Sequence, residues 1–309
     1  MHRRDWLVAL LFLLPVIVVI LVFRFIPILY AFVISFYKWG ITGPTKFIWF
    51  SNYIKIIHDA VFWRALGNTF YYSLFSVPLN FVIALFIAIL LNQKVKGLGV
   101  FRTIYFLPVV TSIIAVSIVF KWIYHPRMGL LNFVLNFLHL PTQTWLEESR
   151  GIFQMMTGGH FPIKGPSLAL MSLVFMSVWK GLGYNVVIFL AGLQNIPDYY
   201  YDAARIDGAN RWQSFWNVTF PLLSPVSFYV LLMTTITSFQ VFAPVWMMTG
   251  PPPGGPLGTT NVVVYYLYEN AFTYIRYGYA SALAFVLFMI ILTLTLIQRN
   301  VTEKKVYYE

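Results

Sequence analysis

The sequence contains no cysteine and few charged residues. Because none of its 309 residues is cysteine, disulfide bonds, thiolate nucleophiles and sulfur-ligated metals are excluded. Asp, Glu, Lys and Arg make up only 10% of the chain, whereas a soluble domain carries about 25%, and 59% of the residues are hydrophobic. A soluble core of this size could not bury so much apolar surface, so the composition predicts a membrane protein with several spans.

Motifs for catalysis, metal binding and nucleotide binding are also missing. The five histidines form no i,i+4 pair and none lies beside a carboxylate cluster, which argues against a metal site. No GxxxxGK[ST] loop is present to bind ATP phosphates, and GxSxG and HExxH are absent. We therefore expect a chain that is not an enzyme and binds neither a metal nor a cofactor of its own.

Six apolar stretches are long enough to cross a bilayer, since about 20 residues suffice for a helical span. They are residues 6–37, 69–91, 103–120, 167–194, 222–249 and 279–298. All ten carboxylates lie outside these stretches. Carriers driven by protons or sodium usually keep carboxylates near the membrane midplane. If this chain transports a solute, its energy is therefore expected to come from outside the membrane.

The distribution of basic residues predicts the orientation of the spans. An even number of spans places both termini on one side, together with the connections 92–102 and 195–221, and this side carries 10 basic residues in 54 positions. The opposite side carries 9 in 106. Cytoplasmic loops are enriched in Lys and Arg, so we expect both termini in the cytoplasm. The same bias explains the net charge of +11 without nucleic-acid binding.

The opposite side holds the longer connections, chiefly the predicted extracytoplasmic loop 121–166. Within it, residues 129–140 have the apolar spacing of an amphipathic helix, which would lie on the membrane surface or cap a cavity. The stretch "GPPPGGPLG" (250–258) contains too much proline and glycine for a helix or a central strand. We expect it to be an extended loop before the last span.

Polar side chains within the fourth and fifth spans are candidates for a solute path. They are Ser177, Lys180, Tyr184 and Asn185, and then Thr234, Thr237, Ser238 and Gln240. Hydroxyls and amides suit a neutral, polyhydroxylated solute. Two alternatives remain: small residues near Lys180 could serve helix packing, and hydroxyls can bond back to their own helix. The lysine itself should face a pore or reach a carbonyl or the surface.

The segment 195–221, here called the charged loop, predicts two short helices joined by a tight turn. Pro197 suits a helix start, and Gly208 supplies the left-handed residue that ends the helix near Ile206. A second helix carries Trp212, Phe215 and Trp216 on one face. Pro221 would mark the return into the membrane. Spans begin within a few residues on both sides, which excludes a soluble DNA-binding motif. A solvated interfacial loop and a docking element for a cytoplasmic partner both remain possible.

The stretch "DAARIDGANRWQSFWNVTFPLLSP" (202–225) resembles the EAA loop in permease subunits of binding-protein-dependent ABC importers. Asp202 stands where the family has Glu, and Phe220 where it has Leu. The stretches "FWRALGNTFYY" (62–72), "FLAGLQNIP" (189–197) and "GYASALAFVLFMIIL" (278–292) are similar to the carbohydrate-importing, maltose-type branch. Residues 147–166 form a longer segment than is usual there, and its role is open.

The resemblance implies an all-α membrane protein with six transmembrane helices and a cytoplasmic helix-turn-helix coupling (EAA) loop, in a single permease domain (1–309). The residues that would contact the ATPase are Asp202, Ala203, Ala204, Arg205, Asp207, Gly208, Ala209, Trp212, Phe215 and Pro221. The implied partners are a second related permease in a heterodimer, two cytoplasmic ATPase subunits that hold ATP and Mg, an extracytoplasmic solute-binding protein and membrane lipid. The implied location is a prokaryotic cytoplasmic (inner) membrane.

The resemblance further implies import of a sugar or sugar-like solute such as an oligosaccharide or a glycoside. An alternative is the same architecture for glycerol phosphate or another polyol derivative. From a different class, a passive channel or a membrane-anchored scaffold would need no ATPase. Dependence of uptake on ATP distinguishes these functions.

Overall fold

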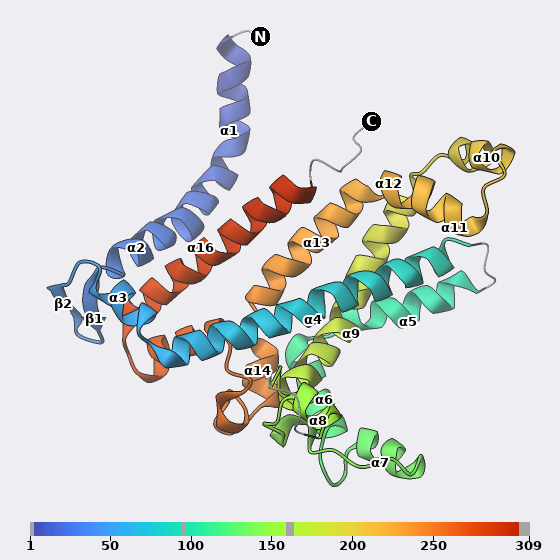
Figure 1. The fold of residues 1–309 in the computed structure, drawn as a ribbon. Helices are drawn as coiled ribbons and strands as arrows, with labels where there is room; N and C mark the ends of the chain where they lie inside the picture. Colours follow the sequence, from blue (N-terminus) through green and yellow to red (C-terminus); the bar gives the residue numbers. More distant parts are fainter. Residues whose placement is uncertain (1–2, 94–96, 159–163, 303–309) are drawn as a thin grey trace. The chain divides into compact units, whose positions relative to one another are not determined.

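The computed structural model describes residues 3–93, 97–158 and 164–302 (Figure 1). Expectations that fall on Lys94, Lys96, Lys304 and Lys305, and on the part of the 147–166 segment at 159–163, lie outside the described residues. The chain divides into two compact units. Unit 1 comprises Met1–Ala60 and Tyr266–Met289, and unit 2 comprises Val61–Tyr265 and Ile290–Glu309.

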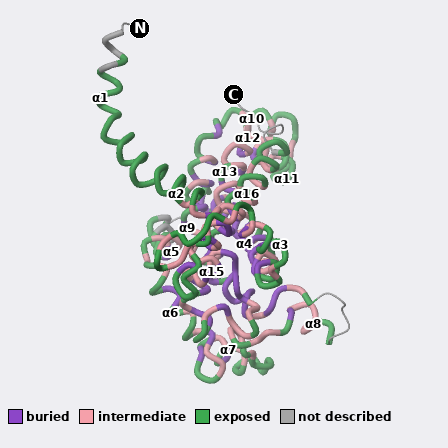
Figure 2. The backbone as a smooth tube through the Cα atoms, turned by 90° about the vertical axis from the view of Figure 1, so that its left-hand side faces the viewer, coloured by how far each residue is buried: buried purple, intermediate pink, exposed green. Residues whose placement is uncertain are grey.

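Unit 1 begins with a long apolar helical arm. Its parts are α1 (Arg3–Ile20), a π-helical turn (Leu21–Phe25) and α2 (Ile26–Ile34). The π-helical turn contains Arg24 and leads into Pro27, so the predicted interruption of this span is a local widening of the helix and not a break. Side chains from Val8 to Ile20 are exposed throughout (Figure 2), as expected of a helix whose apolar surface contacts lipid.

A short antiparallel hairpin follows, which the sequence analysis did not predict. Its strands are β1 (Tyr37–Gly40) and β2 (Gly43–Phe47), with Lys38 opposite Lys46. Gly43 supplies the left-handed conformation at the turn, with φ of 91°. Next comes α3 (Ser51–Ile57), whose Asn52 donates from Nδ2 to the carbonyls of Ser35 at 2.8 Å and Tyr37 at 3.1 Å. This buried amide ties α3 to the start of the hairpin.

Unit 2 is built around one long helix, α9 (Leu168–Gln194). Its N-terminus is capped by Ser167, whose Oγ accepts from the N–H of Leu170 at 3.0 Å. Two buried apolar clusters pack along it, one around Leu170 and Val174 and the other around Phe189 and Leu193. The helix therefore forms the core of the unit from end to end.

The other helices of unit 2 surround α9. They are α4 (Ala60–Leu91), α5 (Leu98–Val110), α6 (Ile113–Ile123), α7 (Leu130–Phe137), α8 (Ile152–Met156), α10 (Asp198–Ile206), α11 (Arg211–Ser214), α12 (Phe220–Leu222), α13 (Ser224–Phe239) and α14 (Ala243–Met248). Two more, α15 (Val263–Tyr268) and α16 (Tyr277–Thr302), run across the boundary between the units. Within unit 2, α10 and α11 lie at one end and α7 and α8 at the other (Figures 1 and 2).

Among the described residues, four helices are long and apolar enough to cross a membrane without a break. These are Val8–Ile34, Ala60–Leu91, Leu168–Gln194 and Tyr277–Val301. Six spans result if each of two bent pairs counts as one span: Thr103–Val110 with Ile113–Ile123, bent by 109°, and Arg211–Leu222 with Ser224–Phe239, bent by 68°. The predicted number therefore holds on that count, but two of the spans are broken.

The broken spans correct two predicted boundaries. The predicted span 103–120 is wrong as a single helix, because the backbone is extended at Thr111 and Ser112. The predicted span 222–249 also breaks, since α13 ends at Phe239 and α14 begins only at Ala243. Pro244 has no N–H for the carbonyl of Gln240, so a regular helix cannot continue across that point.

The long loop after α6 is folded around buried and paired polar groups. The predicted helix within 129–140 is present as α7, and its polar Asn132 is buried while Phe133 is 69% exposed. Asn132 donates to the carbonyls of Pro126 and Gln143, both at 2.7 Å. An apolar face turned outward suits the predicted position on a membrane surface.

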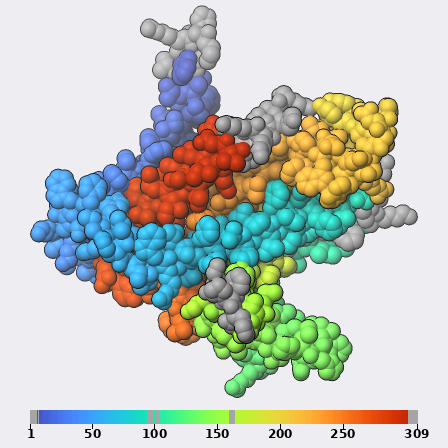
Figure 3. Space-filling view, viewed as in Figure 1, coloured from blue at the N-terminus to red at the C-terminus, as the bar shows by residue number. Residues whose placement is uncertain are grey.

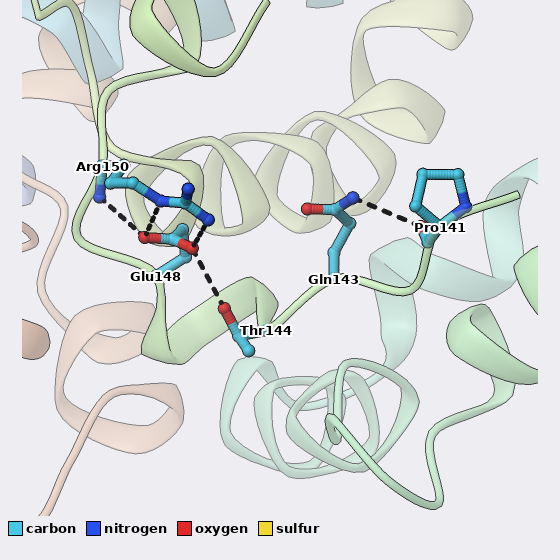
Figure 4. A network of polar contacts seen from close by, with 5 residues as sticks. All are labelled: Pro141, Gln143, Thr144, Glu148 and Arg150. Carbon is cyan, nitrogen blue, oxygen red and sulfur yellow. Dashed lines mark hydrogen bonds and ion pairs between the residues drawn. The ribbon is translucent and has the colours of Figure 1, made fainter. Parts of the chain in front are cut away.

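Figure 4 shows the ionic part of this loop. Arg150 donates to both carboxylate oxygens of Glu148, at 3.0 and 2.7 Å, and Thr144 donates to the same carboxylate at 3.3 Å. The hydrogen bonds and the positive charge of Arg150 lower the pKa of Glu148 to about 2. The carboxylate is therefore ionised over the whole physiological pH range.

The proline-rich stretch 250–258 is not the extended loop that its composition predicted. It closes into a 3-10 turn at Pro256–Gly258, and Gly254 and Gly255 take positive φ values of 102° and 73°. The hydroxyl of Thr249 accepts the N–H of Gly254 at 3.1 Å. Glycines that adopt left-handed conformations let the chain fold back on itself, which composition alone did not indicate.

Candidate functional site

The charged loop forms the predicted pair of helices. The first, α10, begins directly after Pro197, and a left-handed Gly208 with φ of 78° ends the helical region. The N–H of Gly208 donates to Arg205 O at 3.1 Å, and that of Ala209 to Ala204 O at 2.9 Å. No atom lies within 4 Å of the position that a Cβ on Gly208 would occupy. Glycine is therefore required for the backbone conformation and not for lack of space.

The second helix starts at a capping box that the sequence analysis missed. Asn210 Oδ1 accepts the N–H of Gln213, and Gln213 Oε1 accepts the N–H of Asn210, both at 2.9 Å. The spacing Asn-x-x-Gln in "NRWQ" was the available signal. After α11 the chain continues as a π-helical turn (Phe215–Thr219) and α12, so Pro221 lies within the helical stretch and not at its end. The bend falls between Leu222 and Ser224.

The outer surface of the charged loop combines apolar and charged side chains. Ile206 is 87% exposed and Trp212 is 69% exposed. The ring centroids of Trp212 and Phe215 lie 6.2 Å apart. Asp202 and Arg205 form an exposed pair at 3.0 Å, which adds little stability by itself. The loop lies at the molecular surface (yellow in Figure 3). Large exposed apolar side chains beside charges mark a surface that contacts another protein or the membrane interface, so both functions left open by the sequence fit it.

A hollow lies beside this surface, with a volume of about 450 Å³. Its lining includes Arg205, Ala209, Arg211 and Phe215 from the charged loop and Asn92 from the end of α4. The loop is thus in contact with a helix that crosses unit 2.

A pocket of about 520 Å³ lies within unit 2, between α4, α9 and α13. Most of its surface is apolar, and it is here called the polar pocket after the hydroxyl, amide and ammonium groups in its wall. Seven of the eight predicted path residues line it: Ser177, Lys180, Tyr184, Asn185, Thr234, Thr237 and Ser238. Gln240 is not among the lining residues. The sequence analysis missed the wall formed by α4, whose Tyr72, Ser76 and Asn80 complete the pocket. Their helical spacing in a span without charge was the available signal.

Buried amides and hydroxyls join the three helices around the polar pocket. Asn185 Nδ2 donates to Asn80 Oδ1 at 2.6 Å and to Thr234 Oγ1 at 3.3 Å. The hydroxyls of Ser73 and Ser238 share a hydrogen bond of 2.7 Å. Because each bond links side chains on different helices, these bonds hold α4, α9 and α13 at fixed distances from one another.

Both alternatives left open by the sequence are also present in this pocket. Thr234 and Thr237 donate to the carbonyls of Val230 at 2.6 Å and Met233 at 2.9 Å, four residues earlier in each case. At Gly181, a Cβ would stand 2.8 Å from Asn80 Nδ2, so the glycine serves close packing. The hydroxyl oxygens of Thr234 and Thr237 nevertheless keep lone pairs that can accept hydrogen bonds from a solute. Packing and lining therefore coexist on the same helices.

Lys180 reaches carbonyl groups instead of a counter-ion. Its Nζ donates to the carbonyl of Pro108 and to that of Val109 at 3.1 Å, at the broken end of α5. The last carbonyls of a helix have no partner within it, and the cation satisfies them. Lys180 therefore reaches carbonyl groups and also lines the pocket, so both positions expected for this lysine are present. The described lining of the polar pocket includes no carboxylate.

The described part of the chain has no group of three or more His, Asp or Glu residues placed to hold a metal ion. The polar pocket offers hydroxyls, amides and aromatic rings to a solute. Its described lining contains no carboxylic acid for proton transfer. The Tyr184 hydroxyl lies 3.4 Å from that of Tyr229, and the Tyr184 side chain is 50% exposed. Such a surface suits a neutral solute with many hydroxyl groups.

Comparisons with known proteins agree over nearly the whole chain. Residues 61–306 match the family described as "Binding-protein-dependent transport system inner membrane component". The chain is similar to the probable ABC transporter permease protein YurN of Bacillus subtilis (strain 168), with 36% identity over 96% of this chain and 97% of that protein. It is also similar to the arabinooligosaccharides transport system permease protein AraP of the same organism, with 34% identity over 93% of this chain and 86% of that one.

One solved structure gives the same fold. A chain of the bacterial alginate ABC transporter in complex with alginate pentasaccharide-bound periplasmic protein aligns with a TM-score of 0.80, covering 98% of this chain and 96% of that chain. The identity is 22%, so this likeness concerns the fold alone. The mostly helical membrane architecture expected from the sequence is confirmed by it.

Proposed function

The chain belongs to the family of binding-protein-dependent transport system inner membrane components, and from this premise we propose that it is the permease subunit through which an ABC importer moves a sugar or sugar-like solute into the cytoplasm. It is a multi-pass membrane protein and a transport subunit. The relative AraP carries arabinooligosaccharides in its name, which supports an oligosaccharide or glycoside as the solute.

The observation that carries this proposal is the make-up of the polar pocket. Hydroxyls and amides of α4, α9 and α13 line it, together with the rings of Tyr72 and Tyr184. Aromatic rings offer stacking faces for a sugar ring, and the neutral polar groups can exchange hydrogen bonds with its hydroxyls. The residues assigned to the path are Ser177, Lys180, Tyr184, Asn185, Thr234, Thr237 and Ser238. Gln240 would act only outside this pocket.

The energy for transport would come from partner ATPase subunits through the charged loop. ATP and Mg would be bound there, since this chain has no GxxxxGK[ST] loop. The coupling contact would use Asp202, Ala203, Ala204, Arg205, Asp207, Gly208, Ala209, Trp212, Phe215 and Pro221. The exposed Ile206 and Trp212 support such a contact.

The charged loop would face the cytoplasm, together with both termini, and the whole chain would work as one permease domain. The placement of α10–α11 and α7–α8 at opposite ends of unit 2 supports opposite sides for the charged loop and the loop 121–166. A solute-binding protein would deliver the solute on the side of α7. Two ATPase subunits and a second related permease would complete the complex.

Phosphorylated polyols are a second candidate class of solute. Lys180 is the one cation in the described lining of the polar pocket, and two of its three ammonium donors go to the carbonyls of Pro108 and Val109. One donor is therefore left for a phosphate, which carries more charge than a single partly engaged lysine offsets. A neutral sugar needs no cation, so the rest of the lining favours the sugar.

Reconstitution tests the proposal. We expect liposomes containing this chain with its partner permease, ATPases and binding protein to accumulate sugar only when ATP is supplied. Uptake that proceeds equally without ATP would support a passive channel instead.

A second arm tests the charged loop through Gly208→Val. A β-branched residue at φ of 78° costs about 1–3 kcal/mol of backbone strain. Solute-stimulated ATP hydrolysis should therefore be uncoupled from uptake while the complex still assembles. The control is Gly43→Val, which has a φ of 91° and equal free space but lies in the hairpin of unit 1. Normal uptake by Gly208→Val would rule out the coupling role.

A further inference from the structure

A second pocket, in unit 1, has no part in the path proposed above. It has a volume of about 540 Å³ and is here called the interfacial pocket. Most of its walls come from three parts of the chain: β1, the α3 region from Asn52 to Asp59, and residues Ile275 to Tyr279 around the start of α16. Thr45 of β2 and Tyr266 of α15 complete the lining. Within unit 1 these three segments enclose one cavity.

Each of the three segments adjoins the end of a membrane-spanning helix. Strand β1 begins three residues after Ile34, where the first span ends. Asp59 directly precedes the span that begins at Ala60, and Arg276 directly precedes the span that begins at Tyr277. The interfacial pocket therefore lies where the hydrocarbon core gives way to the headgroup layer.

The lining of the interfacial pocket carries an excess of positive charge. Lys38, Lys55 and Arg276 line it, and none of them forms an ion pair with a carboxylate among the described residues. The guanidinium of Arg276 lies over the ring of Tyr274, 5.4 Å from its centroid. The described lining contains these three cations and a single carboxylate, that of Asp59. The pocket is thus prepared for an anion.

Two tyrosines of the pocket lining form hydrogen bonds to Asp59. Its Oδ2 accepts the hydroxyl protons of Tyr266 at 2.5 Å and Tyr279 at 2.6 Å. Burial and this hydrogen bond raise the pKa of Tyr266 to about 12, so its hydroxyl stays protonated. Each phenol oxygen donates its proton to the carboxylate and keeps lone pairs for a hydroxyl of a ligand. The two tyrosines thereby engage Oδ2 of Asp59, which itself remains part of the pocket lining.

Aromatic rings complete the interfacial character of the site. Trp39 lines the pocket and packs edge-on against Tyr30, with ring centroids 5.8 Å apart, and against Tyr37 at 6.1 Å. Trp and Tyr concentrate at the level of lipid headgroups, where one end of the ring is wet and the other apolar. Basic pockets between transmembrane helices bind anionic lipid headgroups on the cytoplasmic side of membranes. In the predicted orientation this pocket lies at the opposite interface, where the same attraction between basic side chains and a lipid phosphate applies.

We propose that the interfacial pocket binds the headgroup of an anionic phospholipid, with the phosphate held by Lys38, Lys55 and Arg276. Headgroup hydroxyls, as in phosphatidylglycerol, would donate to the phenol oxygens of Tyr266 and Tyr279. A bound lipid would join the hairpin, the end of α3 and the start of α16 through one phosphate. The same chemistry would recognise a soluble phosphate ester, and the position at three span ends favours the lipid.

Native mass spectrometry of the purified full transporter tests this proposal. The complex is equilibrated with mixed micelles of phosphatidylglycerol and phosphatidylcholine, and bound lipids are counted. Each basic side chain strengthens binding to an anionic lipid roughly fivefold, so the variant Lys38→Gln, Lys55→Gln, Arg276→Gln should bind phosphatidylglycerol about 100-fold more weakly. Equal retention of phosphatidylglycerol by the triple variant and the unaltered protein would overturn the proposal.

The matched control is Lys46→Gln. Lys46 stands opposite Lys38 in the hairpin register but does not line the pocket. Lys46→Gln should retain phosphatidylglycerol. If it loses as much lipid as the triple variant, the loss reflects general surface charge, and the proposed site is refuted. All four side chains are exposed, and a melting curve of each variant verifies that the fold is intact.

Soluble glycerol phosphate distinguishes the two sources of phosphate. Added at millimolar concentration, it should leave the bound phosphatidylglycerol in place, because it lacks acyl chains to anchor it. If it displaces the lipid and binds the unaltered protein but not the triple variant, the site belongs to a soluble phosphate ester. That result would refute the lipid assignment.

Discussion

Lys180 allows the sharpest test of how the polar pocket is built. Substitution by methionine keeps the length and most of the volume of the side chain but removes the ammonium group. The carbonyl of Val109 then loses its bond of 3.1 Å, and the carbonyl of Pro108 loses one of its donors. Pro108 keeps the hydroxyl of Thr111, at 2.7 Å. The perturbation is therefore confined to the broken end of α5.

The size of the effect follows from these bonds. A hydrogen bond to a charged group contributes about 1.5–3 kcal/mol to the free energy of unfolding. Only Val109 O is left without this donor, because Thr111 continues to serve Pro108, so we expect Lys180→Met to lose about 2 kcal/mol. For a chain of 309 residues that corresponds to a fall in melting temperature of roughly 3 °C.

The assay compares melting of the purified complex with uptake kinetics in liposomes. Lys46→Met is the control, since this exposed lysine on β2 has the same chemistry and lies far from α5 in the sequence. It should melt within about 1 °C of the unaltered protein. If Lys180→Met instead melts normally and shows a raised KM for the solute, Lys180 acts on the solute and the capping role is refuted.

Three further predictions concern other polar groups. Asn185→Leu leaves Asn80 Oδ1 without its donor at 2.6 Å, so we expect a loss of about 1–3 kcal/mol in unfolding free energy together with slower uptake; an unchanged melting temperature would contradict the packing role of this bond. Asn210→Ala removes the capping box and should lower the stability of the charged loop by about 1 kcal/mol. We expect faster hydrogen exchange in that segment alone. Exchange rates in the charged loop equal to those of the unaltered protein would contradict this prediction. Glu148→Gln should cost about 1 kcal/mol at pH 7, because the partner Arg150 is mostly exposed. The pKa of Glu148 is lowered by folding, so this contribution is complete above its ordinary pKa and is lost as the pH falls towards 2; the difference in melting temperature between the two proteins must shrink over that range.

The charged loop could be predicted closely because its signals are local. Pro197 and Gly208 act on the backbone of their own neighbours, so their positions alone determine where α10 begins and ends. The amphipathic helix around 130–137 was predicted for the same reason. Local signals of this kind do not depend on which distant segment lies nearby.

The missed features depend on contacts between distant residues. The hairpin at 37–47 has no strong turn dipeptide, and its position is fixed by Asn52 from a later helix. The break at Thr111–Ser112 lies inside an apolar stretch that looks continuous, and its end is stabilised by Lys180, about seventy residues further on. Asn80 was overlooked because a single amide in α4 gains meaning only beside Asn185. Pairings of this kind are not visible in the order of residues.

The exposed arm α1 has a consequence for how this chain is made and how it can change. No side chain from Val8 to Ile20 is buried, so within unit 1 no tertiary packing holds the arm in shape. Its helicity then depends on the lipid, in which a backbone must satisfy its own hydrogen bonds. The arm can partition into the bilayer as an independent first step of biogenesis, before the remaining helices assemble. Selection on this segment would then act through its mean hydropathy, and substitutions that exchange one apolar side chain for another should be tolerated as neutral drift.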